Sequence, residues 1–505
     1  MSGLLGTRQD DIAAVGIDET IFASETRLAS WCERIGAAGL RGTASPAHER
    51  LISWVEEELQ AVPGMVVRTD EYSILGWAPS PSGDLASAGV LRVADDRIEI
   101  AGAVPYSRPG SSSGELVHLE RAQDIGPACA GKIVLRDFPD LSMPYDQLLR
   151  PALHVSPDME SLRHQAWDRP GFADTILHND LLAAGQAGAA GVIFAFDLPR
   201  EQVSGYFEPH KGTHYRVPAA FVGVRERDRL LAMTGATAHL AVSADVGPAR
   251  TRNVFGTLPG RSKERIVLVT HTDGNTWVQD NGIAALLALA RYFAERPLER
   301  TLEFSFTSAH LHISREGALR YAKRLDAEYD EGTVAFAFPI EHLGARELVP
   351  VLAPDGMPGR ELAFTGHAEP VLWAAGPSEP IRAAVSKAVA HRRLERVIMT
   401  PGLGTPVPGR VPAMLSFGGL GTYFNQQLIP TTSILSAPWS LWAPHFGSSA
   451  VDIALLRRQS LACGDVVAAL DKVPRTELSG DYLADRSARA AGAPIGVDME
   501  PPEVA

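Results

Sequence analysis

The sequence predicts an α/β fold with a β-rich unit inserted into it. After about residue 250, short apolar runs typical of strands alternate with amphipathic segments typical of helices. From residue 79 to residue 249 the apolar runs are shorter and are separated by turns rich in Pro, Gly and Ser. The chain has 505 residues, whereas a single hydrophobic core stops growing near about 250–300 residues. We therefore expect more than one folding unit.

The main unit is expected to begin at residues 20–78, which read as two helices followed by a strand. The second of these helices is predicted over residues 51–59, where apolar side chains recur at helical spacing. The main unit then resumes at residues 250–474. The end of the chain, residues 475–505, is acidic and rich in proline, and we expect it to be a mobile tail.

Residues 79–249 are predicted to form the inserted unit. Strands are expected at 131–136, 192–195 and 217–222, and a helix at 180–191. One section, residues 138–178, is a long loop without clear periodicity, which is typical of a lid or of an interface with the main unit. Its aromatic and polar side chains, which argue against disorder, include Tyr145, His154, Met159, His164, Trp167 and His178.

The most informative segment is a predicted strand at residues 266–269 that leads to His271 and Asp273. A helix is predicted just beyond it, opened by Asp280. Strand ends and helix starts at the carboxyl edge of a sheet are where α/β folds place their sites. His271 can bind a divalent ion, Asp273 can orient that imidazole, and Asp280 has two oxygens that could bridge two ions.

In this segment the chain resembles the zinc-dependent aminopeptidase family, which includes glutamate carboxypeptidase and the glutaminyl cyclases (clan MH metallopeptidases). The residues that fit the family motifs in order are Asn253, Val254, Gly256, Pro259, Gly260, His271, Asp273, Asp280, Asn281 and Gly282. The resemblance implies a mixed sheet flanked by helices. It also implies that residues 79–249 are a protease-associated (PA) domain, because AGAAGVI followed by VPAAFV is similar to that domain.

The chain departs from the family at a pair of glutamates, a general base and a metal ligand, that should follow the strand at residues 301–306. His310 and Leu311 stand there instead. An aspartate ligand expected after the strand at residues 333–338 is replaced by Glu341. His342 is its rival, and strand alternation predicts that only one of the two side chains faces the site.

The resemblance further implies a late histidine ligand, and His445 takes that place. One metal shell would contain His271, Asp280 and Glu341. A second would contain Asp280 and His445, completed by His310 or His312. We expect one or two divalent ions, most simply zinc, while the role of His310 stays open between base and ligand.

These residues predict a metal-dependent hydrolase that cleaves an amide or peptide bond in a small molecule or short peptide, with metal-activated water as the nucleophile. Two alternatives remain: a non-catalytic binding or scaffold protein with a degenerate peptidase fold, and an acyl-transfer enzyme similar to the glutaminyl cyclases. Candidate substrate contacts are Tyr423, Asn425, Trp439 and Trp442.

The composition of the chain limits the kinds of partner and the cellular location that we expect. A net charge of −13 disfavours nucleic acid and anionic membranes as partners, and no apolar run approaches the roughly 18 residues of a membrane span. Three cysteines, far apart in sequence, are expected to be buried free thiols. No secretory signal is visible, so we expect a cytoplasmic protein. Whether the chain forms a homo-oligomer stays open.

Overall fold

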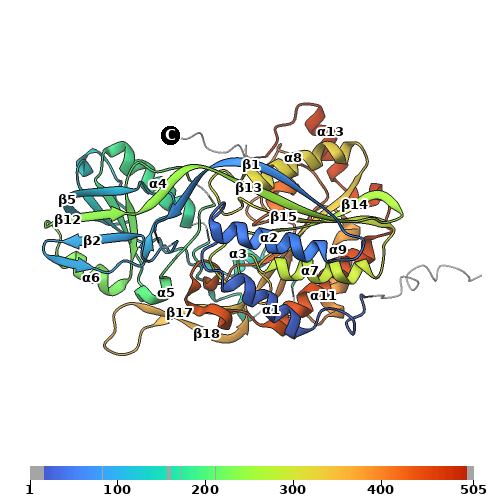
Figure 1. The fold of residues 1–505 in the computed structure, drawn as a ribbon, viewed down its shortest axis with the longest axis horizontal. Coiled ribbons are helices and arrows are strands. Elements are labelled where there is room, and N and C mark those ends of the chain that lie inside the picture. Colours follow the sequence, from blue (N-terminus) through green and yellow to red (C-terminus); the bar gives the residue numbers. More distant parts are fainter. Residues whose placement is uncertain (1–15, 82, 156–160, 172, 211, 497–505) are drawn as a thin grey trace, which may run out of the picture.

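A five-stranded mixed sheet forms the centre of the main unit (Figure 1). The computed structural model describes residues 16–81, 83–155, 161–171, 173–210 and 212–496. In the sheet, β14 pairs in parallel with β15 and β16, whereas β13 runs antiparallel to β15 and to β1. The strands, in sheet order, are β1 (Val66–Pro79), β13 (Ala244–Leu258), β15 (Arg300–Thr307), β14 (Ser262–His271) and β16 (Val334–Pro339).

A second sheet continues the first one beyond β16. Its strands, in order, are β21 (Thr432–Ser436), β19 (Val371–Ala375), β20 (Val397–Thr400) and β8 (His154–Val155). Two parallel bridges, Ala337 to Thr431 and Ile340 to Ile434, connect β16 with the segment that contains β21. The edge strand β8 comes from the inserted unit and pairs antiparallel with β20.

Helices cover both faces of the central sheet, and alternation along β14 explains why. Ile266 and Leu268 pack into one apolar cluster, which contains the inner faces of α1, α2, α7 and α11, while Val267 and Val269 pack into another, which contains α8 and α10. All four β14 side chains are fully buried. The helices are α1 (Glu25–Gly36), α2 (Pro46–Gln60), α7 (Gly282–Ala294), α8 (Glu316–Asp330), α9 (Glu379–His391), α10 (Gly421–Gln426) and α11 (Ile453–Leu470).

The inserted unit has an eight-stranded sheet of its own, at the left of Figure 1. The long antiparallel ribbon of β1 and β13 leads into and out of it. Its strands are β2 (Gly89–Val93), β3 (Asp96–Ile98), β4 (Gly102–Ala103), β5 (Gly110–Leu119), β6 (Ile133–Asp137), β10 (Gly191–Ala195), β11 (Ala219–Val222) and β12 (Thr237–Val242). Its helices are α4 (Ala173–Ala187), α5 (Arg200–Val203) and α6 (Val224–Ala232).

The described part of residues 138–178 packs against the main unit. It contains β7 (Met143–Pro144), α3 (Asp146–Leu149), β8 and β9 (Ala166–Trp167). Tyr145 and Trp167 form an apolar cluster with Ile398 of β20. The section therefore contacts the main unit, while its role as a lid or as an interface stays a prediction. Met159 lies outside the described residues.

The prediction of a mobile tail is wrong for the part of the tail that the structure describes. Residues 475–490 contain α12 (Arg475–Ser479) and α13 (Tyr482–Ala490). Tyr482 is fully buried, and its hydroxyl donates a hydrogen bond to Asn425 Oδ1 at 2.9 Å. Leu478 is also fully buried, so two apolar anchors outweigh the polar composition that led to the prediction. Residues 497–505 lie outside the described part.

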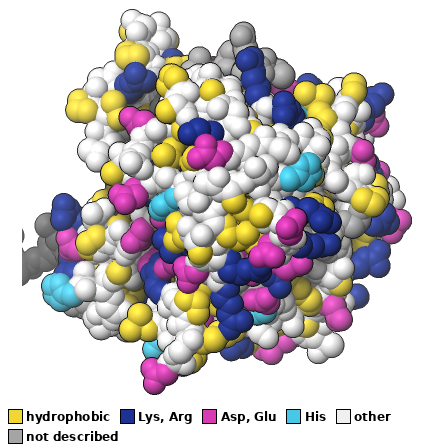
Figure 2. Space-filling view, turned by 90° about the vertical axis from the view of Figure 1, so that its left-hand side faces the viewer, with side chains coloured by type: hydrophobic (Ala, Val, Ile, Leu, Met, Phe, Trp, Pro, Cys, Tyr) yellow, Lys and Arg dark blue, Asp and Glu magenta, His cyan; other side chains and the backbone are white. Residues whose placement is uncertain are grey.

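The surface and the thiols fit the composition. The end of the molecule formed by the inserted unit carries basic and acidic side chains side by side rather than a field of one sign (Figure 2). Cys32, Cys129 and Cys463 are buried and free, which confirms the prediction for the thiols. None of the helices within the described ranges is both long enough and apolar enough to cross a bilayer.

A hairpin of β17 (Arg346–Leu352) and β18 (Arg360–Ala368) projects beside the inserted unit (Figure 1). It follows the carboxyl end of β16. The remaining short elements of the fold are the 3-10 turns η1 (Pro127–Cys129), η3 (Trp439–Leu441) and η4 (Pro444–Ala450).

Candidate metal centre

Four polar side chains meet where three parallel strands end. His271 is the last residue of β14, His310 follows β15, and Glu341 and His342 follow β16. Because β14, β15 and β16 run in parallel, their carboxyl ends lie at the same edge of the sheet. His271 and Glu341 are fully buried, His310 is 2% exposed and His342 is 7% exposed. We call these four residues the histidine cluster.

Three members of the histidine cluster can each offer one ligand atom such that all three atoms lie within 4.8 Å of one another: His271, Glu341 and His342. The backbone fixes the tautomers of the two imidazoles. Nδ1 of His271 donates to the carbonyl of Asp273 at 2.9 Å, and Nδ1 of His342 donates to the carbonyl of Ser436 at 2.9 Å. Each neutral ring therefore keeps its lone pair on Nε2, the atom that can bind a metal.

Several buried polar atoms of the cluster have no hydrogen-bond partner among the described residues. They are Nε2 of His271, both ring nitrogens of His310 and Oε2 of Glu341. Oε2 of Glu341 lies 3.8 Å from Nε2 of His271 and 3.6 Å from Nε2 of His310. Buried polar atoms are rarely left unpaired, because each costs free energy. Their convergence from three strands indicates a site for a cation.

Glu341 is held by a glycine-rich loop. Its Oε1 accepts a hydrogen bond from the backbone N–H of Leu420 at 2.8 Å. A Cβ on Gly419 would approach that same oxygen to 2.5 Å, so only glycine fits there. Burial raises the pKa of Glu341 to about 7, although His271 opposes the shift. A bound cation would favour the ionised form of this carboxylate.

His342 corrects one expectation from the sequence. Alternation predicted that Glu341 and His342 face opposite ways, yet both take part in the same group of ligand atoms. The regular strand ends at Pro339, and His342 has a φ of 55°, in the left-handed region. Alternation therefore no longer applies at this position. A non-glycine residue in this conformation is strained, which is common at functional sites.

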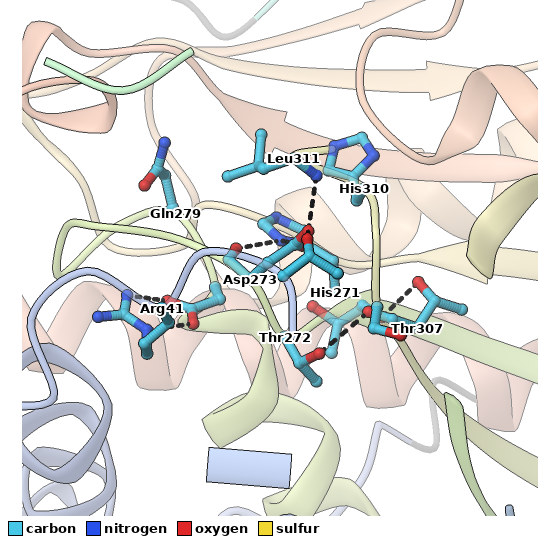
Figure 3. A network of polar contacts seen from close by, with 12 residues as sticks. Arg41, His271, Thr272, Asp273, Gln279, Thr307, His310 and Leu311 are labelled. Carbon is cyan, nitrogen blue, oxygen red and sulfur yellow. Dashed lines mark hydrogen bonds and ion pairs between the residues drawn. The ribbon is translucent and has the colours of Figure 1, made fainter. Parts of the chain in front are cut away.

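Asp273 supports the centre without being part of the group. Its Oδ2 accepts hydrogen bonds from Oγ1 of Thr43 at 2.6 Å and from the backbone N–H of Leu311 at 2.8 Å (Figure 3). Its Oδ1 lies 3.3 Å from Nδ1 of His271. Burial alone would lower the pKa of His271, but the hydrogen bond and charge of Asp273, with Glu341, raise it. Asp273 thus contacts Nδ1 of His271, and its role in orienting that ring stays a prediction.

Asp280 has a partner that the sequence did not reveal. Arg41 donates from Nε to Oδ2 at 2.8 Å and from Nη2 to Oδ1 at 2.7 Å, and both side chains are fully buried (Figure 3). Nη2 of Arg41 also donates to the carbonyl of Thr276 at 2.8 Å. The helix α7 begins with Asn281 as its N-cap, so Asp280 does not cap it. Both oxygens of Asp280 are thus engaged by a cation of the chain itself.

His210 is a neighbour of the cluster that the sequence analysis missed. It comes from the inserted unit, and its ring lies 5.0 Å from that of His310. The segment before it is tied to the main unit: Phe207 donates its N–H to the carbonyl of Trp442 at 3.0 Å, and Gln279 donates to the carbonyl of Phe207 at 3.1 Å. His210 belongs to none of the motifs found in the sequence, so it gave no local signal.

Two of the expected ligands lie elsewhere. His445 is exposed on η4, where its ring packs on Phe446, and it does not belong to the group of ligand atoms found among the described residues. The ring nitrogens of His312 are both occupied, Nδ1 by Ser314 and Nε2 by the carbonyl of Leu75. Neither arrangement leaves these imidazoles directed at His271 and Glu341.

Of the four residues expected to contact the substrate, one adjoins the histidine cluster and three do not. The Tyr423 ring lies 6.0 Å from that of His310, so this residue adjoins the cluster. The amide of Asn425 bonds to Met414 and Tyr482, which gives it a structural role. Trp439 donates to the carbonyl of Asp168 and lines a cavity of about 500 Å³ that contains no member of the cluster. Trp442 is buried and accepts the bond from Phe207.

Solved structures with the same architecture were found. The zinc aminopeptidase BSAP from Bacillus subtilis is 14% identical, with a TM-score of 0.63 over 90% of this chain and 97% of that chain. A peptidase M28 precursor from Shewanella amazonensis SB2B is 15% identical, with a TM-score of 0.59 over 89% and 93%. An aminopeptidase from Aneurinibacillus sp. strain AM-1 is 17% identical, with a TM-score of 0.54 over 88% and 93%.

The fold is that of the zinc aminopeptidases. The predicted fold class, a mixed sheet flanked by helices, is thereby confirmed. No family model and no curated protein sequence matched the chain. At 14–17% identity the likeness concerns the fold, and the chemistry of the centre has to be argued from its own residues.

Proposed function

We propose that the protein is a metal-dependent hydrolase that cleaves an amide or peptide bond in a small molecule or short peptide. The ligands would be His271, Glu341 and His342, and zinc is the expected ion. The observation that carries the proposal is the convergence of three buried ligand atoms at the carboxyl ends of two neighbouring parallel strands, β14 and β16, with unpaired atoms on His271 and Glu341. The aminopeptidase fold supports the reaction class.

The donor set fits zinc. Two imidazole nitrogens and one carboxylate oxygen are the ligands of many catalytic zinc sites, which keep a further position open. When bound, zinc supplies a Lewis acid that polarises a carbonyl group and lowers the pKa of water towards neutrality. Asp273 and the carbonyl of Ser436 hold the two rings in the tautomer and orientation that such binding requires.

We further propose that the centre holds one ion. According to the family resemblance, a second ion would need Asp280, His445 and a glutamate at position 311 as ligands. Asp280 is engaged by Arg41, His445 is exposed, and Leu311 is apolar. The guanidinium of Arg41 thus provides the positive charge that compensates Asp280. Replacing Arg41 would leave a buried carboxylate without a partner, which costs about 3–5 kcal/mol.

His310 is then free to carry a proton. With His342 completing the ligand set, His310 is not needed as a ligand, and neither of its nitrogens has a partner among the described residues. Nε2 lies 3.6 Å from Glu341, next to the place where the ion would sit. In this position the imidazole can accept a proton from the attacking water and deliver it to the leaving nitrogen.

The test is elemental analysis of the purified protein after loading with zinc and removal of free ion. We expect about one ion per chain, lost in His271→Ala and His342→Ala and retained in His445→Ala, the exposed control. His310→Ala should keep the ion but lose about 10²–10⁴-fold in turnover of a dipeptide or N-acyl amino acid mixture.

Other results would contradict the proposal. Two ions per chain would exclude the single-ion centre, while retention of zinc in both His271→Ala and His342→Ala would exclude the ligand assignment. A zinc-loaded protein that hydrolyses no amide in the mixture would exclude the hydrolase and favour a binding protein.

A further inference from the structure

Arg315 stands at the entrance to α8, five residues after His310. It is the N-cap of that helix, with φ 52° and ψ 20°, in the left-handed region. Its backbone N–H donates to the carbonyl of His312 at 2.9 Å. An arginine gains nothing from this conformation, since glycine or asparagine would adopt it at lower cost. The backbone strain indicates that the side chain is what matters at this position.

The guanidinium of Arg315 has no acceptor in the described part of the chain. Its Nε is buried without a hydrogen bond, and no ion pair involves this residue. The neighbouring carboxylate of Glu316 lies 3.5 Å from Arg320 instead. Arg315 is only partly buried, and its terminal nitrogens are not among the buried unpaired atoms, so they remain open to an acceptor from outside the chain.

Comparison with other arginines shows that the lack of a carboxylate partner at Arg315 is unusual in this molecule. Four more arginines have a buried nitrogen without a hydrogen bond, but each holds a carboxylate through another nitrogen. These pairs are Arg121 with Asp180, Arg291 with Glu58, Arg324 with Asp70, and Arg396 with Glu347. Among the described arginines with such a nitrogen, Arg315 alone lacks a carboxylate.

Arg315 follows His310 by five residues, and its charge acts on residues at the histidine cluster. It contributes to the low pKa of His310 and of His210, after burial and neighbouring groups, and it opposes the effect of burial on Tyr423. Tyr423 adjoins His310, and its hydroxyl forms no hydrogen bond with any described residue. Two donors without acceptors among the described residues, a guanidinium and a phenol, therefore lie near His310, the residue proposed to carry the proton.

We propose that Arg315, assisted by the Tyr423 hydroxyl, binds a carboxylate of the substrate, either a free C-terminal carboxylate or an acidic side chain. The inference rests on the proposed function and names its substrate class: acidic amides or peptides with a carboxylate near the scissile bond. Arginine suits this role because its planar fork binds a carboxylate through two parallel hydrogen bonds. Tyr423 can donate a third bond.

The experiment measures binding of matched probes to the full-length protein by calorimetry. One pair is N-acetyl-Ala-Ala and its C-terminal amide, and the other is N-acetyl-Glu-amide and N-acetyl-Gln-amide. We expect the acid of at least one pair to bind about ten- to a hundredfold more tightly than its uncharged partner. The pair that shows the preference tells whether the carboxylate is terminal or on a side chain.

Arg315→Met should abolish this preference, Arg315→Lys should retain part of it, and Arg320→Met should retain all of it. Arg320 is the matched control, since it is exposed on the same helix and already faces two carboxylates. The unfolding midpoint of unliganded Arg315→Met should be unchanged or higher, because its guanidinium forms no hydrogen bond or ion pair with the described residues and its buried Nε has no partner. A residue with a merely structural role would lower it.

The same titrations with zinc removed by a chelator separate Arg315 from the ion. A preference that persists after zinc is removed supports the proposal. A preference that is lost when zinc is removed, or that survives in Arg315→Met, overturns it. No preference in the wild-type protein also overturns it. The calorimetric titrations measure binding and do not depend on turnover. If the protein prefers acids through Arg315 but hydrolyses no amide, that result contradicts the proposed function and leaves this inference standing.

Discussion

Two buried polar clusters in this molecule contain similar chemistry and differ in how it is paired. In the first, the histidine cluster, ligand atoms of His271, His310 and Glu341 face one another without partners. The second ties the inserted unit to the main unit through Arg169, which donates to both oxygens of Glu369 at 3.1 and 3.0 Å. Arg169 also lies 3.4 Å from Glu347, which accepts from Arg396 at 2.7 Å. Both clusters are almost fully buried.

The difference shows which buried polar clusters indicate a functional site. In the Arg169 cluster, two guanidinium groups balance two carboxylates, and each carboxylate accepts hydrogen bonds from at least one of them, so no ligand is needed to balance the charge. In the histidine cluster, one carboxylate faces the Nε2 lone pair of His271, which cannot donate a hydrogen bond to it. Such an arrangement is unfavourable by itself and becomes favourable when a cation enters. Burial and charge alone do not distinguish the two cases, whereas hydrogen-bond pairing does.

Arg169→Met should give the largest change in stability. It leaves Glu369 buried without its cation, so we expect a loss of about 3–5 kcal/mol in the free energy of unfolding. Urea denaturation measures this loss. Zinc content should stay at the wild-type value, and a loss of zinc would show that the two clusters are not independent.

Glu341→Gln should change stability in the opposite direction. Burial raises the pKa of Glu341 from 4.5 to about 7. The folded, metal-free chain therefore binds more protons than the unfolded chain, and stability falls as pH rises from about 4.5 to about 7. Above pH 7 the ionised carboxylate costs about 3 kcal/mol, which the variant recovers.

The measurement for Glu341→Gln is urea denaturation of the metal-free protein at pH 5 and pH 8. The gain should appear at pH 8 and be small at pH 5, and the variant should no longer retain zinc. Glu369→Gln is the matched control and should be destabilised at pH 8, because Arg169 loses its partner. If Glu341→Gln and Glu369→Gln changed the free energy of unfolding equally, the proposed distinction between the two clusters would be wrong.

Thr43→Val should have the smallest effect. It removes the hydrogen bond from Thr43 to Asp273, at a cost of about 1 kcal/mol. Because we expect Asp273 to orient His271, zinc affinity in competition with a chelator should fall about tenfold. Thr365→Val removes an equivalent bond to Glu347 in the Arg169 cluster. It should cost similar stability and leave zinc affinity unchanged.

The sequence was a good guide where short-range patterns decide the structure. Apolar runs predicted β14, β15 and β16, and the polar residues at their ends, His271, His310 and Glu341, are those that the fold brings together. These positions follow from strand order and direction, which the family resemblance supplied.

The sequence was a poor guide where single backbone angles or distant contacts decide. The left-handed conformation of His342 cannot be read from alternation. The partner of Asp280 is Arg41, 239 residues away, and a local motif gives no sign of it. His210 reaches the cluster from the inserted unit. Composition also concealed the anchors of α12 and α13, because the buried side chains of Leu478 and Tyr482 matter more than the average polarity of the tail.

The short strand β8 has a consequence for solubility. It pairs with β20, whose four residues, Val397–Thr400, are all buried and of high β-propensity. Without β8, this strand would present a row of unpaired backbone groups at the sheet edge, a template on which chains can aggregate. The loop that supplies β8 therefore acts as a guard against self-association. Shortening that loop to simplify the protein should produce precipitation before it alters the centre.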